Sequence, residues 1–352
     1  MAAGELNLQQ GAWLRGGGPL HDVVVSSRVR LARNLAGMPF LSRCSPAQQR
    51  ELEQRLRQEV LSAELAPEMF YVDVESAGEL DRLLLVERHL ISRQHADAGH
   101  PRGVAIAKDE TVAVMINEED HLRIQVLRSG LQLEDACEAI NQLDDRLEER
   151  LSFAFHRRWG YLTACPTNVG TGLRVSVMLH LPAVKMTGEI ERVFRAARDM
   201  RLAIRGLFGE GTEATGDFFQ VSNQTTLGKT EDQIIREFRD DIIPHFIEYE
   251  RRARRYVAEH QSVTVDDRIY RADAILRAAR RVSCDEALHY LSLVRMGVDL
   301  DKLTNTNLRT VNELCLLSQP AHLQRIAGRP METTERDEAR ADYIRHRLAG
   351  RG

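Results

Sequence analysis

The sequence has little of what marks several specialised classes of protein. No run approaches the roughly 20 apolar residues that a membrane-spanning helix needs, and only 5% of the residues are aromatic. The 5 cysteines are widely spaced, without a Cys-x-x-Cys pair. These absences argue against a membrane protein, a disulfide framework and a zinc site. Together with the net charge of −4, they also disfavour a general nucleic-acid platform.

Lysine is scarce as well. It occurs only at positions 108, 185, 229 and 302, so 44 of the 48 basic residues are arginines. Codon bias in a GC-rich genome is sufficient to explain the bulk of this ratio. A guanidinium group nevertheless offers a planar set of donors that suits phosphate, which the lysine ammonium lacks. The positions of the arginines are therefore more informative than their number.

The composition is that of a folded globular protein, with 43% hydrophobic and 28% charged residues. A length of 352 residues predicts one large domain and a smaller one. The first residues, Met1 to Glu5, lack the basic-then-apolar pattern of a secretion signal, so we expect a cytoplasmic protein.

Local patterns divide the chain near residue 254. Ser45 followed by Pro46 predicts the start of a helix that continues to residue 65. Strands are predicted at 69–74, 112–116, 124–127, 173–179 and 218–221, several of them alternating as in antiparallel sheets. Helical patterns occupy 133–151 and 187–201, and a helix from Thr230 is expected to break or kink at Pro244. Beyond about residue 255 the patterns are helical, at 269–279, 286–296, 307–317 and 332–348.

Five arginines stand within or beside these strands, where burial is costly without compensation. They are Arg28, Arg30, Arg123, Arg174 and Arg205. Arg28 and Arg30 are two residues apart and therefore on the same side of a strand. Each arginine alone is typical of a surface residue or an ion-pair partner. As a set, they suggest guanidinium groups that converge on a polyphosphate.

Two further segments could carry chemistry. The acidic cluster of residues 118–120 follows a buried-looking strand, and is either a solvated turn or a source of one carboxylate for a cationic substrate or for general-base catalysis. The loop at 165–172, CPTNVGTG, is rich in small residues that let a backbone approach a ligand. It is not a Walker A sequence, and no G-x-G-x-x-G opens a helix after a strand.

Five segments, in order, resemble the guanidino (phosphagen) kinase family. They are SSRVRLARN (26–34), NEEDHLRIQ (117–125), CPTNVGTGLRVSVMLHLP (165–182), RGLFGEGTEA (205–214) and NQTTLGKTE (223–231). A short N-terminal lead, an extra C-terminal helical region and the sequence RDEARA at 336–341 resemble the bacterial protein-arginine kinase (McsB type) branch. The resemblance implies an α+β fold, with a lead at 1–21, a catalytic domain with a largely antiparallel sheet at 22–254 and an all-helical domain at 255–352.

The resemblance also implies an activity, the transfer of the γ-phosphoryl group of ATP to arginine residues of proteins. The five arginines would grip the phosphates, with Mg²⁺ held through the nucleotide and not by protein side chains. Glu119 and Glu210 would hold the substrate guanidinium, and Cys165, otherwise an inert buried thiol, would lie beside the reacting nitrogen. The predicted nucleotide site comprises Ser26, Ser27, Arg28, Val29, Arg30, His89 near the adenine, Arg123, Arg174, Val175, Ser176, Val177, Met178, Arg205, Gly206, Leu207, Phe208, Gly209 and Glu210.

In the last helix, Arg336, Asp337, Arg340 and Ala341 match an R-D-x-x-R-A pattern that this branch carries as an allosteric phosphoarginine site, although a solvated helix face gives the same letters. The resemblance further implies a homodimer, a stress-response role through a Clp-type unfoldase, a heat-shock repressor as substrate and an activator protein. Three alternatives stay open. They are a kinase of free arginine or another small guanidino compound, a carboxylate–amine ligase on a related fold, and a non-catalytic adaptor.

Overall fold

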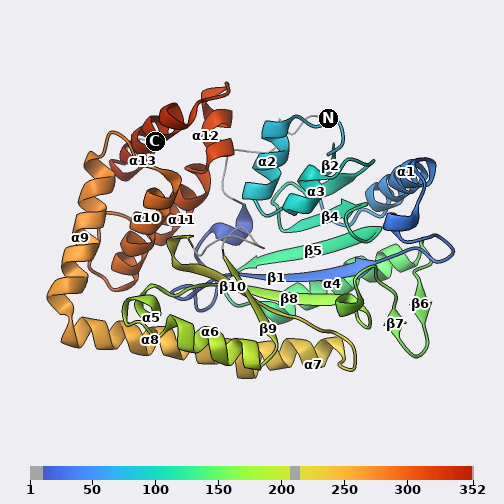
Figure 1. The fold of residues 1–352 in the computed structure, drawn as a ribbon, viewed down its shortest axis with the longest axis horizontal. Helices are drawn as coiled ribbons and strands as arrows, with labels where there is room; N and C mark the ends of the chain where they lie inside the picture. Colours follow the sequence, from blue (N-terminus) through green and yellow to red (C-terminus); the bar gives the residue numbers. More distant parts are fainter. Residues whose placement is uncertain (1–10, 207–214, 351–352) are drawn as a thin grey trace.

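The computed structural model describes residues 11–206 and 215–350. Its centre is an eight-stranded sheet in which every neighbouring pair is antiparallel, in the order β2-β3-β4-β5-β1-β8-β10-β9 (Figure 1). The strands are β1 (Val24–Arg33), β2 (Met69–Asp73), β3 (Gly103–Ala107), β4 (Val112–Ile116), β5 (Leu122–Ser129), β8 (Leu173–His180), β9 (Leu202–Gly206) and β10 (Phe218–Asn223). A small hairpin, β6 (Phe155–His156) and β7 (Gly160–Tyr161), stands apart from the sheet.

Alternating side chains give this sheet two different faces. One face carries the largest core, where α1 (Pro46–Ser62), α4 (Leu133–Glu148), α6 (Ile190–Asp199) and α7 (Glu231–Arg236) pack. At the β2 end, the opposite face packs against α2 (Glu79–Glu87) and α3 (Arg93–Asp97) around Leu84 and Ile106. The remaining part of that second face, over β1, β8 and β10, is left for the site described below.

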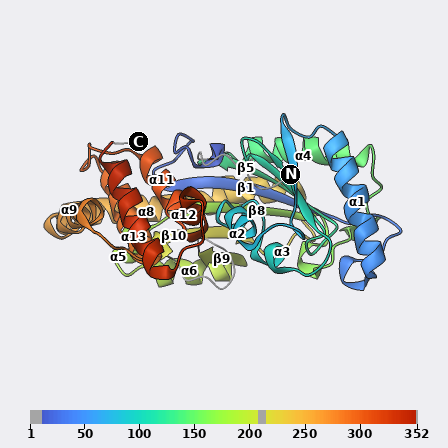
Figure 2. The same ribbon diagram turned by 90° about the horizontal axis from the view of Figure 1, so that it is seen from above.

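The C-terminal helices build a further core with the ends of the central strands. They are α9 (Ser262–Ala278), α10 (Cys284–Asp299), α11 (Leu308–Leu317), α12 (Pro320–Ala327) and α13 (Thr333–Leu348), and they lie at one end of the sheet (Figure 2). Trp13 and Leu14 of the N-terminal lead are buried in the same core, beside Met178 and Phe218. These two residues of the lead are thus an integral part of the packing. Within the described ranges, no helix has the length and apolarity needed to cross a membrane.

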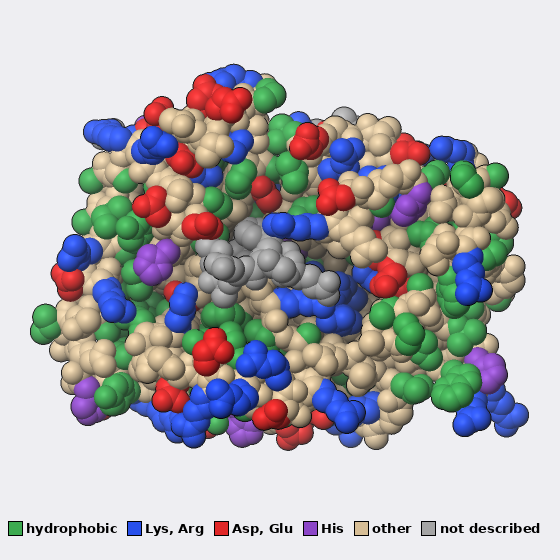
Figure 3. All heavy atoms as spheres, viewed as in Figure 1, with side chains coloured by type: hydrophobic (Ala, Val, Ile, Leu, Met, Phe, Trp, Pro, Cys, Tyr) green, Lys and Arg blue, Asp and Glu red, His purple; other side chains and the backbone are tan. Residues whose placement is uncertain are grey.

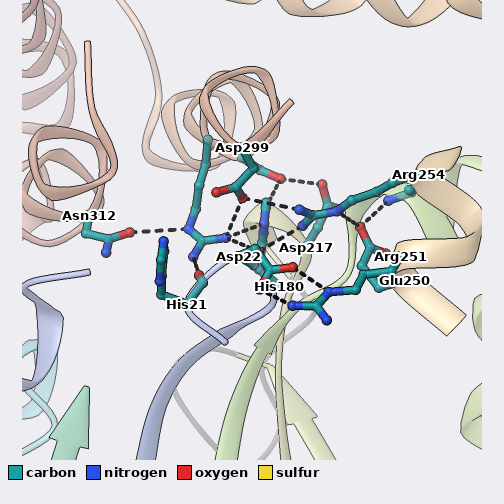
Figure 4. A network of polar contacts seen from close by, with 12 residues as sticks. His21, Asp22, His180, Asp217, Glu250, Arg251, Arg254, Asp299 and Asn312 are labelled. Atoms are coloured by element: carbon teal, nitrogen blue, oxygen red, sulfur yellow. Dashed lines mark hydrogen bonds and ion pairs between the residues drawn. The ribbon is translucent and has the colours of Figure 1, made fainter. Parts of the chain in front are cut away.

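A buried ionic network joins the helical region to the sheet (Figure 4). Arg254 and Arg295 both donate to the Asp299 carboxylate, at 3.3 and 3.4 Å, and both donate to the backbone carbonyl of Asp22. Arg254 also pairs with Glu250 at 2.7 Å. Since every one of these buried charges is paired, the network favours one arrangement of the two regions.

The predicted α+β class is confirmed, and most element boundaries lie within a few residues of the expectation. The Ser45 side chain accepts from the Gln48 amide and caps α1. The helix from Thr230 does not break at Pro244. It passes through a π-helical stretch (Glu237–Ile242) and continues as α8 (Ile243–His260), with Pro244 next to the junction of the two. The predicted domain boundary at 254 lies inside α8 and stays a prediction.

Candidate active site

A cavity of about 480 Å³ opens on the uncovered face of the sheet. It is lined by the whole set of strand-associated arginines, Arg28, Arg30, Arg123, Arg174 and Arg205, and by His89, Glu119 and Cys165. In the space-filling view, basic side chains gather around the hollow near the middle of this face (Figure 3). Residues distant in the sequence therefore meet at one place, as their placement in strands predicts.

The antiparallel register of β1 and β8 decides which predicted residues reach the cavity. Arg30 lies directly opposite Arg174, and Arg28 lies opposite Ser176. Ser26, Ser176 and Met178 line a smaller space beside Arg28 and His89. The intervening residues of the predicted set point to the helix-covered face, where they are fully buried. These are Ser27, Val29, Val175 and Val177. They can contact a nucleotide only through the backbone.

Arg28 and Arg30 are buried close to other arginines of the set. Burial and the neighbouring Arg174, Arg123 and Arg205 lower the pKa of Arg28 to about 10. Burial and repulsion from Arg28, Arg123 and Arg174 lower the pKa of Arg30 well below its usual value. Among the described residues, the buried Nε of Arg30 finds no hydrogen-bond partner. Such a pocket is organised for a polyanion before the polyanion arrives.

Neutral side chains on β10 orient two of these arginines. Gln220 Oε1 accepts from Arg28 at 2.7 Å, and Ser222 Oγ accepts from Arg174 at 3.2 Å. Asn223 accepts from the Val175 amide and thereby ties β10 to β8. These residues were missed at the level of sequence. The alternation in Phe218–Asn223 already places Gln220 and Ser222 on one face, and that signal could have found them.

The acidic turn after β4 supplies two carboxylates. Arg123 contacts Glu118 at 2.6 Å and Glu119 at 2.9 Å. Glu118 is buried, which by itself raises its pKa, but Arg123 and a hydrogen bond from Ser92 hold that pKa below the usual value. The Glu119 side chain is 34% exposed in the cavity, and burial outweighs the attraction of Arg123 and raises its pKa. Glu119 is thus the carboxylate that a ligand can reach.

The rest of this turn fixes the loop that carries Cys165. Asp120 is fully buried, and its Oδ1 accepts from Asn34 Nδ2 and from the Ala164 amide, both at 2.7 Å. Cys165 follows immediately, with its Sγ 3.0 Å from Thr167 Oγ1. The acidic motif therefore has two tasks. Glu118 and Glu119 face Arg123, while Asp120 sets the position of the neighbouring loop.

His89 lines the cavity from the segment that follows α2. Its ring meets the ring of Trp13 edge-on, at 5.4 Å between centroids. Burial and the charge of Arg28 lower the pKa of His89 to about 3, so its imidazole is neutral at physiological pH. A neutral ring beside Trp13 and Met178 is suited to an aromatic, uncharged ligand group.

Several predicted residues lie elsewhere. Gly206 ends β9 next to Arg205, whereas Leu207, Phe208, Gly209 and Glu210 lie outside the described residues. In α13, Arg340 is buried, and it donates to the carbonyls of Ser318 and Val282 and pairs with Asp337. Ala341 is buried in the core, and Arg336 is partly exposed. The four residues of this motif do not line the cavity.

Comparisons with known proteins identify the family. Residues 51–253 match the family model for the ATP:guanido phosphotransferase C-terminal catalytic domain. The chain belongs to this family. Residues 262–351 match the protein-arginine kinase McsB C-terminal domain. Proteins named protein-arginine kinase from Halothermothrix orenii and Symbiobacterium thermophilum are 45% and 48% identical, over 97% and 96% of this chain and 98% and 96% of theirs.

Two solved structures share the fold. A duplicated taurocyamine kinase from Schistosoma mansoni, with bound transition state analog components, matches 70% of this chain at 28% identity and a TM-score of 0.60. The match covers 35% of that longer chain. A lombricine kinase matches 70% of each chain at 24% identity and a TM-score of 0.55, a likeness of fold. The family resemblance and the assignment to protein-arginine kinases within it are confirmed, and so is the enzyme class of guanidino phosphotransferase.

Proposed function

We propose that the protein transfers the γ-phosphoryl group of ATP to the guanidinium of arginine residues in proteins. The observation that carries this proposal is that five arginines and the accessible carboxylate of Glu119 line one and the same cavity. Relatives that match nearly the full chain are named protein-arginine kinase, which supports the same acceptor.

The charge distribution of the cavity suits phosphoryl transfer. This reaction needs in-line positioning of the reactants and neutralisation of the phosphate oxygens, with little covalent chemistry by the protein. Arg28, Arg30 and Arg174 project from neighbouring strands and would bind the triphosphate. In the described part of the chain, no group of three or more His, Cys, Asp or Glu could hold a metal ion. Mg²⁺ usually binds through substrate phosphates and water, and it would neutralise part of the phosphate charge here.

The acceptor is a cation, and a protonated guanidinium is a poor nucleophile because its pKa lies above about 12. The Glu119 carboxylate would pair with the guanidinium, align one nitrogen with the γ-phosphorus and take up its proton. Cys165 would lie beside that nitrogen, and Glu210 would provide a second carboxylate, as the family resemblance implies.

Two kinds of acceptor fit this scheme, an arginine residue of a protein and free arginine or a similar small guanidino compound. The match to the McsB C-terminal domain favours the protein acceptor. A free amino acid would also require contacts to its α-amino and α-carboxyl groups, and we assign no residue to that task.

Further proposals rest on the family alone. The protein would act in the cytoplasm as a homodimer, mark stress-damaged or regulatory proteins for a Clp-type unfoldase, phosphorylate a heat-shock repressor and respond to an activator protein. Phosphoarginine would bind at the RDEARA motif of α13 and act allosterically. No direct contact with nucleic acid or membrane is required for any of these roles.

The deciding experiment is incubation with ATP, Mg²⁺ and an unfolded, arginine-containing substrate protein, with free arginine in a parallel reaction. Peptides are then analysed by mass spectrometry without acid, because the phosphorus–nitrogen bond is acid-labile. We expect phosphoarginine in peptides of the substrate protein. Phosphorylation of free arginine alone would favour the small-molecule alternative, and no product with either acceptor would contradict the proposal.

A further inference from the structure

The C-terminal helical region lies directly behind the His89 side of the cavity. Helix α12 packs alongside α2 (Figure 1), and Ala321 of α12 is fully buried in the same core as Leu84 of α2. Three consecutive residues at the end of α2 connect the two. His89 lines the cavity, whereas Glu87 and Arg88 bond to α12.

Glu87 caps the N-terminus of α12 from outside that helix. Its Oε1 accepts from the Ala321 amide at 2.8 Å, and its Oε2 accepts from the His322 amide at 3.1 Å. The regular cap residue, Gln319, makes no side-chain cap bond in the described structure. Free amides and the helix dipole both favour a carboxylate at this point. Glu87 therefore links two regions that are more than 200 residues apart in the sequence.

Arg88 and His322 complete a buried polar cluster. Arg88 donates to Glu110 at 2.6 Å and to His322 Nε2 at 3.2 Å, and both Arg88 and His322 are buried. Because Nε2 accepts, the ring hydrogen is on Nδ1, which donates to Glu87 Oε2 at 2.7 Å. Removing one member leaves other buried polar groups unsatisfied, so the cluster acts as a unit.

This cluster borders a residue with an unfavourable backbone conformation. His89 has a φ of +58°, a left-handed value that is uncommon for residues other than glycine. Its carbonyl accepts from Gln125 Nε2 at 2.9 Å, and its amide donates to the Val86 carbonyl. Such a conformation persists only where the surroundings impose it. Gln125 holds His89 on the side of the sheet, and Glu87 and Arg88 anchor the chain before it to α12.

We propose that Glu87 and His322 are positioning residues for nucleotide binding. They fix the end of α2 to α12, and this fixes the His89 ring where the base of ATP would bind. The C-terminal helical region is then a structural part of the nucleotide site. The inference rests on the proposed function in one respect only, since that function places ATP in this cavity.

Calorimetric titration tests the inference with the full-length protein, without an acceptor. Glu87→Gln and His322→Ala should each weaken ATP binding about five- to tenfold, as expected for the loss of a buried charged hydrogen bond. Binding of inorganic tripolyphosphate, which can contact the arginines but has no base, should change less than about twofold. Glu79→Gln, at the exposed start of the same helix, is the matched control and should bind both ligands normally. Unchanged ATP affinity, or equal loss for both ligands, would overturn the proposal.

A second measurement needs no nucleotide. The chain has 2 tryptophans, so Trp159→Phe leaves Trp13, which contacts His89, as the only tryptophan reporter. Glu87→Gln in this background should change the emission of Trp13, whereas Glu79→Gln should not. Identical emission of Trp159→Phe alone, with Glu87→Gln and with Glu79→Gln would overturn the inference, whether or not arginine is the acceptor. Failure of the proposed function would instead be seen as absent phosphoarginine with intact ATP binding.

Discussion

Arg123 and Glu119 form an ion pair at 2.9 Å within the cavity. The proposed function gives these two residues to different substrates, Arg123 to the phosphates and Glu119 to the guanidinium. In the described structure, the Glu119 carboxylate therefore lies where a phosphate would bind Arg123. Likewise, the Arg123 guanidinium lies where the substrate guanidinium would bind Glu119. Because the Glu119 side chain is partly exposed, this pair is weak enough to be exchanged for substrate contacts.

Replacement of Glu119 should affect the reaction of the guanidinium acceptor and leave ATP binding nearly unchanged. We expect Glu119→Ala to lower the rate of arginine phosphorylation by at least about 100-fold, the range associated with a lost general base. ATP affinity should stay within about threefold of the wild type, since the arginines are untouched. Radiolabel transfer and calorimetry measure the two quantities. Glu75→Ala, on an exposed pair with Arg50, serves as the control. Near-normal turnover of Glu119→Ala would refute the assigned role.

The acid limb of the pH profile should report on the same residue. Burial raises the pKa of Glu119, and the proposed role needs its ionised form. Activity, measured as kcat/KM for the acceptor, should therefore fall as the pH is lowered through a value above the ordinary 4.5 of glutamic acid. The residual activity of Glu119→Gln should lack this limb. An identical acid limb in that variant would assign the titration to another group.

Arg30 should be unfavourable for stability and favourable for binding. Its pKa is depressed because it is recessed among other arginines, so the folded protein holds a poorly compensated charge. We expect Arg30→Met to leave the free energy of unfolding unchanged or to raise it by about 1–2 kcal/mol, and to weaken ATP binding at least about tenfold. Urea denaturation and calorimetry test this. Arg55→Met, exposed on α1, should change neither quantity. Lower stability with intact binding would contradict the prediction.

Acid should destabilise the fold through His180. This ring is buried, and burial together with Arg295 and Arg254 depresses its pKa well below 6.5. Below pH 6.5 the unfolded chain takes up a proton that the folded chain does not, so this contribution to stability is complete above pH 6.5 and lost as the pH falls. We expect His180→Gln to reduce the pH dependence of the unfolding free energy below pH 6 by up to about 1.4 kcal/mol per pH unit. The unfolding free energy is measured by urea denaturation at several pH values, and an equal change with pH in His180→Gln and the wild type would contradict this prediction. His346→Gln, at an exposed position, is the control.

The two arginines of the RDEARA motif should behave differently. Arg340 is buried and bonded to two carbonyls and to Asp337, so Arg340→Ala should lower the free energy of unfolding by about 3–5 kcal/mol. Arg336 is partly exposed, and Arg336→Ala should leave stability within about 0.5 kcal/mol. The single variant Arg336→Ala is thus the interpretable test of phosphoarginine binding. Calorimetry with free phosphoarginine should show lost binding, and wild-type affinity would remove Arg336 from that site.

The sequence-based predictions were most accurate where local pattern and structure coincide. Strand-like runs identified β8 and β10, Ser45 followed by Pro46 identified the start of α1, and helical periodicity identified α10. The arginines predicted in or beside strands line the cavity. Strand β3 was missed because its five residues, GVAIA, include one glycine and two alanines, which are depleted in strands. Helix α12 was missed although Pro320 at its start and Gly328 after its end are local signals, and the carboxylate that caps it, Glu87, comes from another region. The task of Asp120 depends on contacts with Asn34 and Ala164, which are distant in the sequence, and no local pattern reveals it.

The pairing of β1 with β8 affects the stability of the folded protein. Like charges placed directly across two strands weaken their association, and Arg30 faces Arg174 in this manner. A bound triphosphate would remove that repulsion and shift the equilibrium toward the native state by mass action. The supply of substrate would then influence not only the rate of catalysis but also how well this enzyme resists unfolding and degradation.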